Sequence, residues 1–175
     1  MAGNKNKLLE YPRDLVGYNG SYTNPKWPEK AKVAIQFVLN YEEGAENCIL
    51  HGDKQSETFL SEIIGAPAFE NARHMSMESI YEYGSRAGVW RILTLFRERR
   101  VPITIFGVAM AMQRHPRPIE QALKDGHEIC SHGLRWINYH GVDINTEREH
   151  LQEAIEIHKQ VCGNRPLGWY TGRTS

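Results

Sequence analysis

"VAIQFVLNYEEGAE", residues 33–46, joins an apolar run to two adjacent acidic residues. Its apolar first part, Val33–Leu39, has the composition of a buried β-strand. Polar and acidic residues follow directly, in the order Asn40, Tyr41, Glu42, Glu43 and Gly44. Since ligands in open α/β sheets bind just beyond the carboxyl ends of the strands, the two adjacent carboxylates mark this strand end as a candidate site.

The composition narrows the range of partners. The 175 residues include 21 basic (Lys and Arg) and 21 acidic side chains, which gives a formal net charge of zero. Such a chain has no global field that attracts nucleic acid or an anionic membrane. No run approaches the roughly 18 apolar residues of a membrane-spanning helix, and residues 1–20 lack the apolar segment of a secretion signal. We therefore expect a cytoplasmic protein with a small-molecule substrate, no nucleic-acid partner and no membrane association.

Strand-like and helix-like segments alternate along the chain. After the first strand, strands are predicted at residues 101–107, 127–133 and 165–175. Helices are predicted at residues 89–100 and 116–126, and from a capping-box pattern at Thr146–Glu149 to Gly163. Residues 45–75 are expected to form a long loop with one short helix. We divide the chain into an irregular N-terminal arm, residues 1–30, and one α/β domain, residues 31–175.

Strands that alternate with helices at these spacings predict βαβ units and a parallel sheet. In such sheets the ligand lies at the carboxyl ends of the strands, whether the sheet is open or closed into a barrel. The residues at the four predicted strand ends are Asn40, Glu42 and Glu43; Phe106 and Gly107; Ser131, His132 and Trp136; and Trp169, Tyr170 and Arg173. Acids, a histidine, an arginine and large aromatic residues are thus expected at one edge of the sheet.

Four segments carry a resemblance to a known family. "QFVLNYEEG", "VPITIFGVA", "GHEICSHGLRW" and "PLGWYTGR" resemble, in order and spacing, the polysaccharide deacetylase (NodB-like) homology domain, and within it the metal-independent allantoinase branch. The resemblance implies a distorted (β/α)7-type barrel of parallel strands. Only about four of its strands are recognisable here, so we expect the chain to represent the N-terminal half to two-thirds of such a barrel, truncated after the fourth strand.

The departures from the family pattern bear on metal binding. The resemblance places Glu42 and Glu43 at the family's paired aspartates, His132 at its first metal-binding histidine and Trp136 at its second. An indole cannot ligate a metal ion, so the usual Asp and two His set is incomplete and we expect no metal and no other cofactor. A substitute ligand, His140 in the following loop, remains an open alternative.

The resemblance also implies the reaction, hydrolysis of the cyclic amide of allantoin or a related ureide. Such a reaction needs a base to activate water, stabilisation of the carbonyl oxygen and a proton for the leaving nitrogen. We assign catalysis to Glu42 as candidate base, Glu43 as second acid or substrate anchor, and His132 as proton donor or oxyanion partner. Which glutamate is the base stays open at this point. The candidate substrate-binding residues are Asn40, Trp136, Trp169, Tyr170 and Arg173.

Two other functions stay in play. One is a metal-dependent carbohydrate or amide deacetylase that recruits a substitute ligand, and the other is an inactive barrel fragment or assembly module. Relatives that the chain resembles are oligomeric, so a homo-oligomer is expected, with residues 45–75 as a candidate contact. Without the resemblance, the two glutamates would fit a solvated turn and His132 a core histidine.

Overall fold

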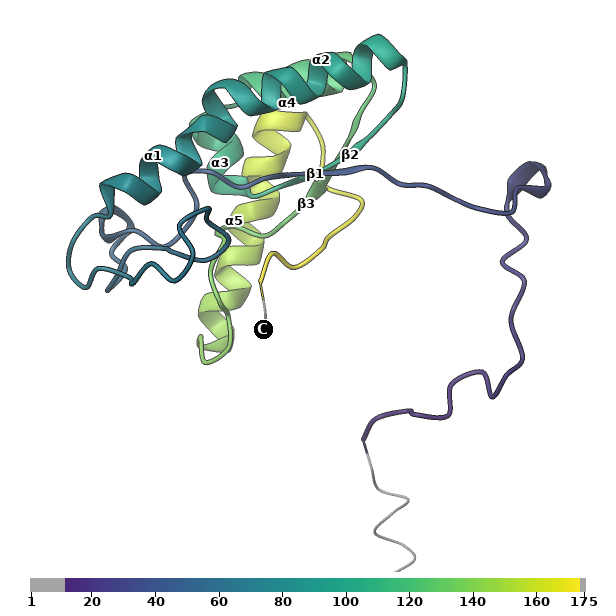
Figure 1. The fold of residues 1–175 in the computed structure, drawn as a ribbon, viewed down its shortest axis with the longest axis horizontal. Helices are drawn as coiled ribbons and strands as arrows, with labels where there is room; N and C mark the ends of the chain where they lie inside the picture. Colours follow the sequence, from purple (N-terminus) through teal and green to yellow (C-terminus); the bar gives the residue numbers. More distant parts are fainter. Residues whose placement is uncertain (1–11, 174–175) are drawn as a thin grey trace, which may run out of the picture. The chain divides into compact units, whose positions relative to one another are not determined.

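The computed structural model describes residues 12–173, and these fall into two compact units (Figure 1). The boundary between the units lies between Ile35 and Gln36. In the first unit, the described residues form one short 3-10 helix, Pro28–Lys30, in an otherwise irregular segment. The second unit contains the sheet, the longer helices and all the predicted site residues.

The sheet has three parallel strands in the order β1-β2-β3. They are β1 (Val38–Tyr41), β2 (Thr104–Gly107) and β3 (Glu128–Ser131). The register pairs Asn40 with Phe106, and Phe106 with Cys130. The α/β class with parallel strands is therefore confirmed. The first strand begins later than predicted, because the ladder to β2 starts only where the Thr104 amide donates to the Phe37 carbonyl.

The predicted fourth strand, residues 165–175, is reduced to a single parallel bridge between Ser131 and Trp169. The Ser131 amide donates to the Gly168 carbonyl and the Tyr170 amide to the Ser131 carbonyl, each at 3.0 Å. Pro166 has no N–H to extend this ladder backward. The last two residues of the prediction, 174 and 175, lie outside the described part of the chain.

The helices occupy the chain segments between the strands and after the last strand. In chain order they are η2 (Ile49–His51), α1 (Met75–Tyr83), the π-helical turn η3 (Gly84–Gly88), α2 (Val89–Arg99), α3 (Ala109–Arg114), α4 (Arg117–Lys124) and α5 (Ile144–Cys162). α1, η3 and α2 follow one another without a break and form one rod (Figure 1). The predicted start of the last helix was wrong by one turn. Asp143 caps α5 by accepting from the Asn145 and Thr146 amides, so Thr146 lies inside the helix.

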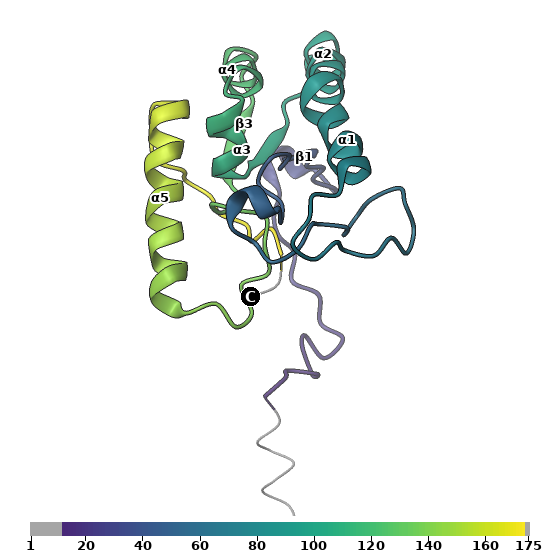
Figure 2. The ribbon, with the colours of Figure 1, turned by 90° about the vertical axis from the view of Figure 1, so that its left-hand side faces the viewer.

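Alternate strand residues point to the helices and make the core. Tyr41, Ile105 and Ile129 pack with buried residues of α2 and α4, such as Leu93 and Ile119. In Figure 2, α5, α4 and α2 lie side by side, from left to right. The alternation leaves Asn40, Phe106 and Cys130 in register on the opposite face of the sheet.

No helix in residues 12–173 is long and apolar enough to cross a membrane.

Candidate functional site

The carboxyl ends of β1 and β3 bring Glu42 and His132 into contact. Nε2 of His132 lies 3.0 Å from Oε1 of Glu42, although the two residues are 90 positions apart in the chain. The imidazole is 3% exposed. Its other nitrogen, Nδ1, lies 2.7 Å from the main-chain oxygen of Tyr170. The parallel sheet thus places an acid and a histidine together, as the strand-end rule predicts.

These two contacts fix how many protons the pair holds. The Tyr170 carbonyl can only accept a hydrogen bond, so Nδ1 of His132 carries a proton. Nε2 and Oε1 then share a second proton, because two acceptors at 3.0 Å would otherwise repel. The pair is therefore either an imidazolium with a carboxylate or an imidazole with a carboxylic acid. In both states His132 orients the Glu42 carboxyl through the contact between Nε2 and Oε1.

Glu43 lies in a different environment from its neighbour. Burial raises the pKa of its carboxyl, and the nearby charges of Glu42 and Glu46 raise it further, against hydrogen bonds from the Glu42 and Glu43 amides that lower it. The Glu42 amide donates to Oε2 of Glu43 at 3.4 Å. Two adjacent carboxyl groups with environments this different suit an acid and a base.

The two acids open onto a cleft of about 160 Å³. Its lining residues come from the strand ends, the long loop and α1, and they are Asn40, Glu42, Glu43, Glu46, Phe59, Leu60, Tyr81 and Trp136. Phe59 and Trp136 stack with their ring centroids 5.8 Å apart and make an aromatic wall. The Tyr81 hydroxyl donates to the Phe59 carbonyl at 3.0 Å. Burial, with nearby acids, raises the pKa of Tyr81 to about 12, so this hydroxyl keeps its proton.

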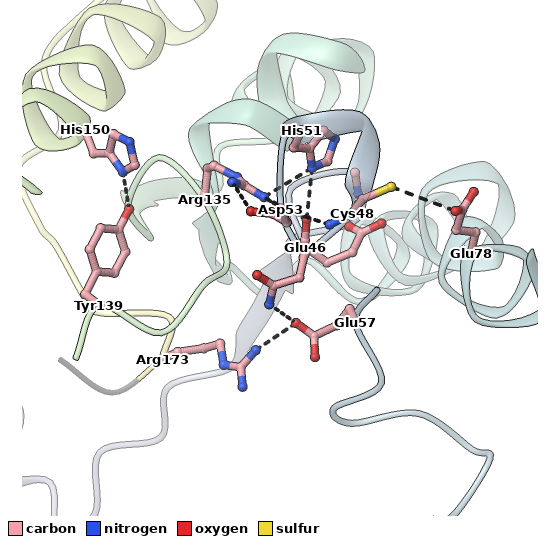
Figure 3. A network of polar contacts seen from close by, with 12 residues as sticks. Glu46, Cys48, His51, Asp53, Glu57, Glu78, Arg135, Tyr139, His150 and Arg173 are labelled. Atoms are coloured by element: carbon pink, nitrogen blue, oxygen red, sulfur yellow. Dashed lines mark hydrogen bonds and ion pairs between the residues drawn. The ribbon is translucent and has the colours of Figure 1, made fainter. Parts of the chain in front are cut away.

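Arg173 reaches the outside of the aromatic wall. Its guanidinium carbon lies 4.8 Å from the Trp136 ring centroid and 4.9 Å from that of Phe59, which is cation–π geometry. Nη1 donates to Oε2 of Glu57 at 2.8 Å (Figure 3). Glu57 is 6% exposed and also accepts from Nδ2 of Asn47 at 2.6 Å. The structure therefore places Arg173 behind Trp136, bound to the long loop.

The other predicted aromatic residues lie at the margin of the site. The Tyr170 ring stacks on Phe106 with centroids 5.1 Å apart, while its main-chain oxygen holds His132. Trp169 is 53% exposed and is not one of the residues that line the cleft. Of the eight predicted site residues, Asn40, Glu42, Glu43 and Trp136 line the cleft. His132 contacts Glu42, and Arg173 contacts Trp136. Tyr170 contacts His132 through its main-chain oxygen.

A half-buried ion pair holds the long loop to the turn after β3. Arg135 donates to both oxygens of Asp53, at 2.9 and 2.5 Å, and to the Glu46 carbonyl at 3.1 Å (Figure 3). Burial raises the pKa of Asp53, but the hydrogen bonds from Arg135 and the Cys48 amide together lower it below its usual range. The loop that supplies Phe59 to the cleft is thus held by charge as well as by packing.

We expect Asp53→Asn to lower the free energy of unfolding at pH 7 by about 1 to 3 kcal/mol, because hydrogen bonds to charged groups contribute in this range. A carboxyl whose pKa is lowered by folding stabilises the protein above the unfolded pKa, near 3.9, and loses that contribution as the pH falls through the folded value. Urea unfolding should therefore show a gap between wild type and variant that closes at acid pH. A gap that widens at acid pH would contradict this assignment. Glu98→Gln, at an exposed position of α2, serves as the control.

Comparisons with known proteins agree with this geometry. The family model for polysaccharide deacetylase matches residues 71–173. A protein from Schizosaccharomyces pombe (strain 972 / ATCC 24843), named "Putative polysaccharide deacetylase", is 45% identical over 169 residues, which cover 93% of this chain and 52% of that protein. Among solved structures, the probable polysaccharide deacetylase from Pseudomonas aeruginosa PAO1 is 61% identical with a TM-score of 0.90, covering 94% of this chain and 55% of that one. A Puue allantoinase is also 61% identical, with a TM-score of 0.91, covering 95% and 55%.

The chain belongs to the polysaccharide deacetylase family. It spans about half the length of the relatives that it matches. The predicted barrel is therefore confirmed as a partial one.

The metal site that the family implies does not fit these residues. Glu42 and His132 offer two donors, but the third position is Trp136, whose indole N–H has no lone pair for a metal ion. Within residues 12–173, no three His, Cys, Asp or Glu side chains are placed to hold an ion. His140, the alternative ligand, is exposed in its loop. We therefore derive no chemical step through a metal.

Sequence reasoning missed Glu46, which lines the cleft, and two acidic residues that hold the long loop beside it. Glu57 and Asp53 lie in the long loop, where no periodicity points to a partner, and their arginines are 116 and 82 positions away. The π-helical turn beside Glu43 was also missed. Its sequence, "GSRAG", has two glycines, and these are the signal that could have indicated an irregular helix.

Proposed function

We propose that the complete protein hydrolyses the hydantoin ring of allantoin to allantoate, without a metal ion. The observation that carries the proposal is the pair Glu42 and His132 at the cleft, with Trp136 where a metal ligand would stand. The similarity to a Puue allantoinase supports the choice of substrate. The cleft, with an aromatic wall and polar groups on the other side, suits one small flat ring.

In the proposed mechanism, Glu42 is the general base. Its carboxylate takes a proton from water as the oxygen attacks the ring carbonyl. In the imidazolium–carboxylate state of the pair, His132 donates to Oε1 and so keeps the second carboxylate oxygen directed to the water. The side chain of Asn40, which lines the cleft, donates to the carbonyl oxygen as negative charge develops on it.

Glu43 is the general acid in this scheme. Burial raises the pKa of its carboxyl, so it keeps a proton at higher pH than an exposed glutamate. When the ring C–N bond breaks, Glu43 donates this proton to the leaving nitrogen. Glu42 then returns the proton it took from water to Glu43 by way of solvent, which restores both carboxyl groups. One water is consumed, and the products are one free ureido N–H and one new carboxylic acid, which releases its proton to solvent and becomes a carboxylate.

The proposal is tested by assaying ring opening of allantoin beside deacetylation of an N-acetylglucosamine oligomer. We expect turnover of allantoin and none of the sugar. Turnover of the sugar alone would overturn the proposal in favour of the carbohydrate deacetylase that several relatives' names describe.

Removal of metal is expected to leave the activity unchanged. Because no three metal-ligating side chains of residues 12–173 are placed to hold an ion, EDTA or dipicolinate should not lower turnover of allantoin, and elemental analysis should find well under one metal ion per chain. The control is a metal-dependent deacetylase treated in the same way. Loss of activity that zinc restores would show that the complete protein supplies a ligand from elsewhere.

A further inference from the structure

α1 and η3 form one wall of the two cavities beside Glu43. Tyr81 on α1 lines the cleft, and Ser85 in η3 lines a second cavity of about 280 Å³. Glu43 lines both cavities. Its carboxyl therefore stands against this wall at the point where the helix widens into a π-helical turn, a distortion that is frequent at functional sites.

Gly84 is the residue of the wall that faces this carboxyl. A methyl group on Gly84 would overlap Oε1 of Glu43 and come within 2.7 Å of its Cδ. The backbone itself does not require glycine, since φ −57° and ψ −52° are ordinary α-helical values. Glycine inside a helix is also less stable than alanine. What occupies the place of a side chain at Gly84 is the Glu43 carboxyl.

We propose that Gly84 is a positioning residue for the reaction: the gap it leaves in the helix wall fixes where the Glu43 carboxyl stands relative to Glu42. The proposal rests on the proposed function for the role of Glu43 as acid. It adds a residue that touches no substrate and yet sets the geometry of the proton transfer. Because Glu43 is a flexible side chain and the helix is not, a methyl group at Gly84 displaces the carboxyl rather than the helix.

The helix offers a matched control. Gly88 ends the same π-helical turn, with φ −60° and ψ −48°, and a methyl group there would meet Tyr83 Cε1 at 3.4 Å, an ordinary contact. Gly84→Ala and Gly88→Ala therefore make the same chemical change in the same turn. Both are compatible with the backbone, and both are expected to melt at or above the wild-type temperature.

Only Gly84→Ala is expected to lose activity. Misplacement of a catalytic group by about 1 Å costs up to about 10²-fold, so kcat should fall by about 10- to 100-fold with KM within about threefold. Gly88→Ala should keep the wild-type kcat. Loss of activity together with undiminished thermal stability is a result that a merely structural role of Gly84 does not produce.

Shortening the acid should restore part of the loss. In Gly84→Ala with Glu43→Asp, the carboxyl withdraws by one methylene from the new methyl group, so the double variant should lose less than the product of the two single losses. Full additivity, or wild-type kcat in Gly84→Ala, would overturn the positioning role and leave the proposed function standing.

If the wild type does not open allantoin, the proposed function fails and crystal structures decide the inference. A Glu43 carboxyl displaced in Gly84→Ala and unmoved in Gly88→Ala supports it. An unmoved carboxyl in both variants refutes it.

Discussion

Glu42→Gln is expected to lower turnover of allantoin by about 10²- to 10⁴-fold, the usual contribution of a general base. Glutamine fills the same space and its amide can still form a hydrogen bond with Nε2 of His132, so the fold and the binding of substrate should change little. What is lost is the capacity to take a proton from water. The measurement is kcat and KM for the complete protein, with circular dichroism to confirm the fold.

A glutamate outside the site provides the control for this prediction. Glu98 is exposed on α2, and Glu98→Gln should have wild-type kinetics. Glu43→Gln should also lose activity, because the amide has no proton that it can give to the leaving nitrogen. Wild-type turnover in both Glu42→Gln and Glu43→Gln would rule out the carboxylate mechanism.

The polypeptide of residues 1–175 alone is expected not to be an active monomer. β1 pairs with β2 on one side, and within the described residues no strand pairs with its other side. Phe37 and Val38 at this edge are 47% and 43% exposed. Each backbone group left unpaired costs roughly 1 to 3 kcal/mol when buried, and a whole strand of them is comparable with the roughly 5 to 15 kcal/mol of a domain's net stability.

Light scattering after size exclusion, paired with the allantoin assay, measures the outcome. We expect association or aggregation of residues 1–175 and no turnover. A chimera that joins this chain to the part of the Pseudomonas aeruginosa relative that it does not cover should restore a cooperative melt and activity. A cooperatively melting 20.1 kDa monomer of residues 1–175 that opens allantoin would contradict the prediction.

The parallel sheet and the meeting of Glu42 with His132 could be predicted because they depend on local pattern and one general rule. Short β-branched runs identify the strands, and parallel strands bring their carboxyl ends to the same edge. The expectation placed Glu42 and His132 together, and the structure has them 3.0 Å apart.

The long loop could not be predicted in the same way. Its contacts, such as Glu57 with Arg173, join residues far apart in the sequence and follow no periodicity. Sequence reasoning proposed Arg173 as a substrate-binding residue from its place at a predicted strand end and near the family's last motif, and its contact with Glu57 gave no signal in the sequence. The predicted fourth strand, residues 165–175, was too long for a related reason. Strand propensity does not say how many hydrogen bonds a segment makes with the adjacent strand, and here residues 168–170 form a single bridge with β3.

Because His132 is held by the main-chain oxygen of residue 170, this hydrogen bond does not depend on the side chain at that position, whose ring has a separate contact with Phe106. Every amino acid presents the same carbonyl, so substitutions of Tyr170 leave the hydrogen bond available. The length of the segment between Gly163 and Tyr170 is a different matter, because one inserted residue would move the carbonyl away from Nδ1. We therefore expect functional relatives to keep the spacing that leads to this position.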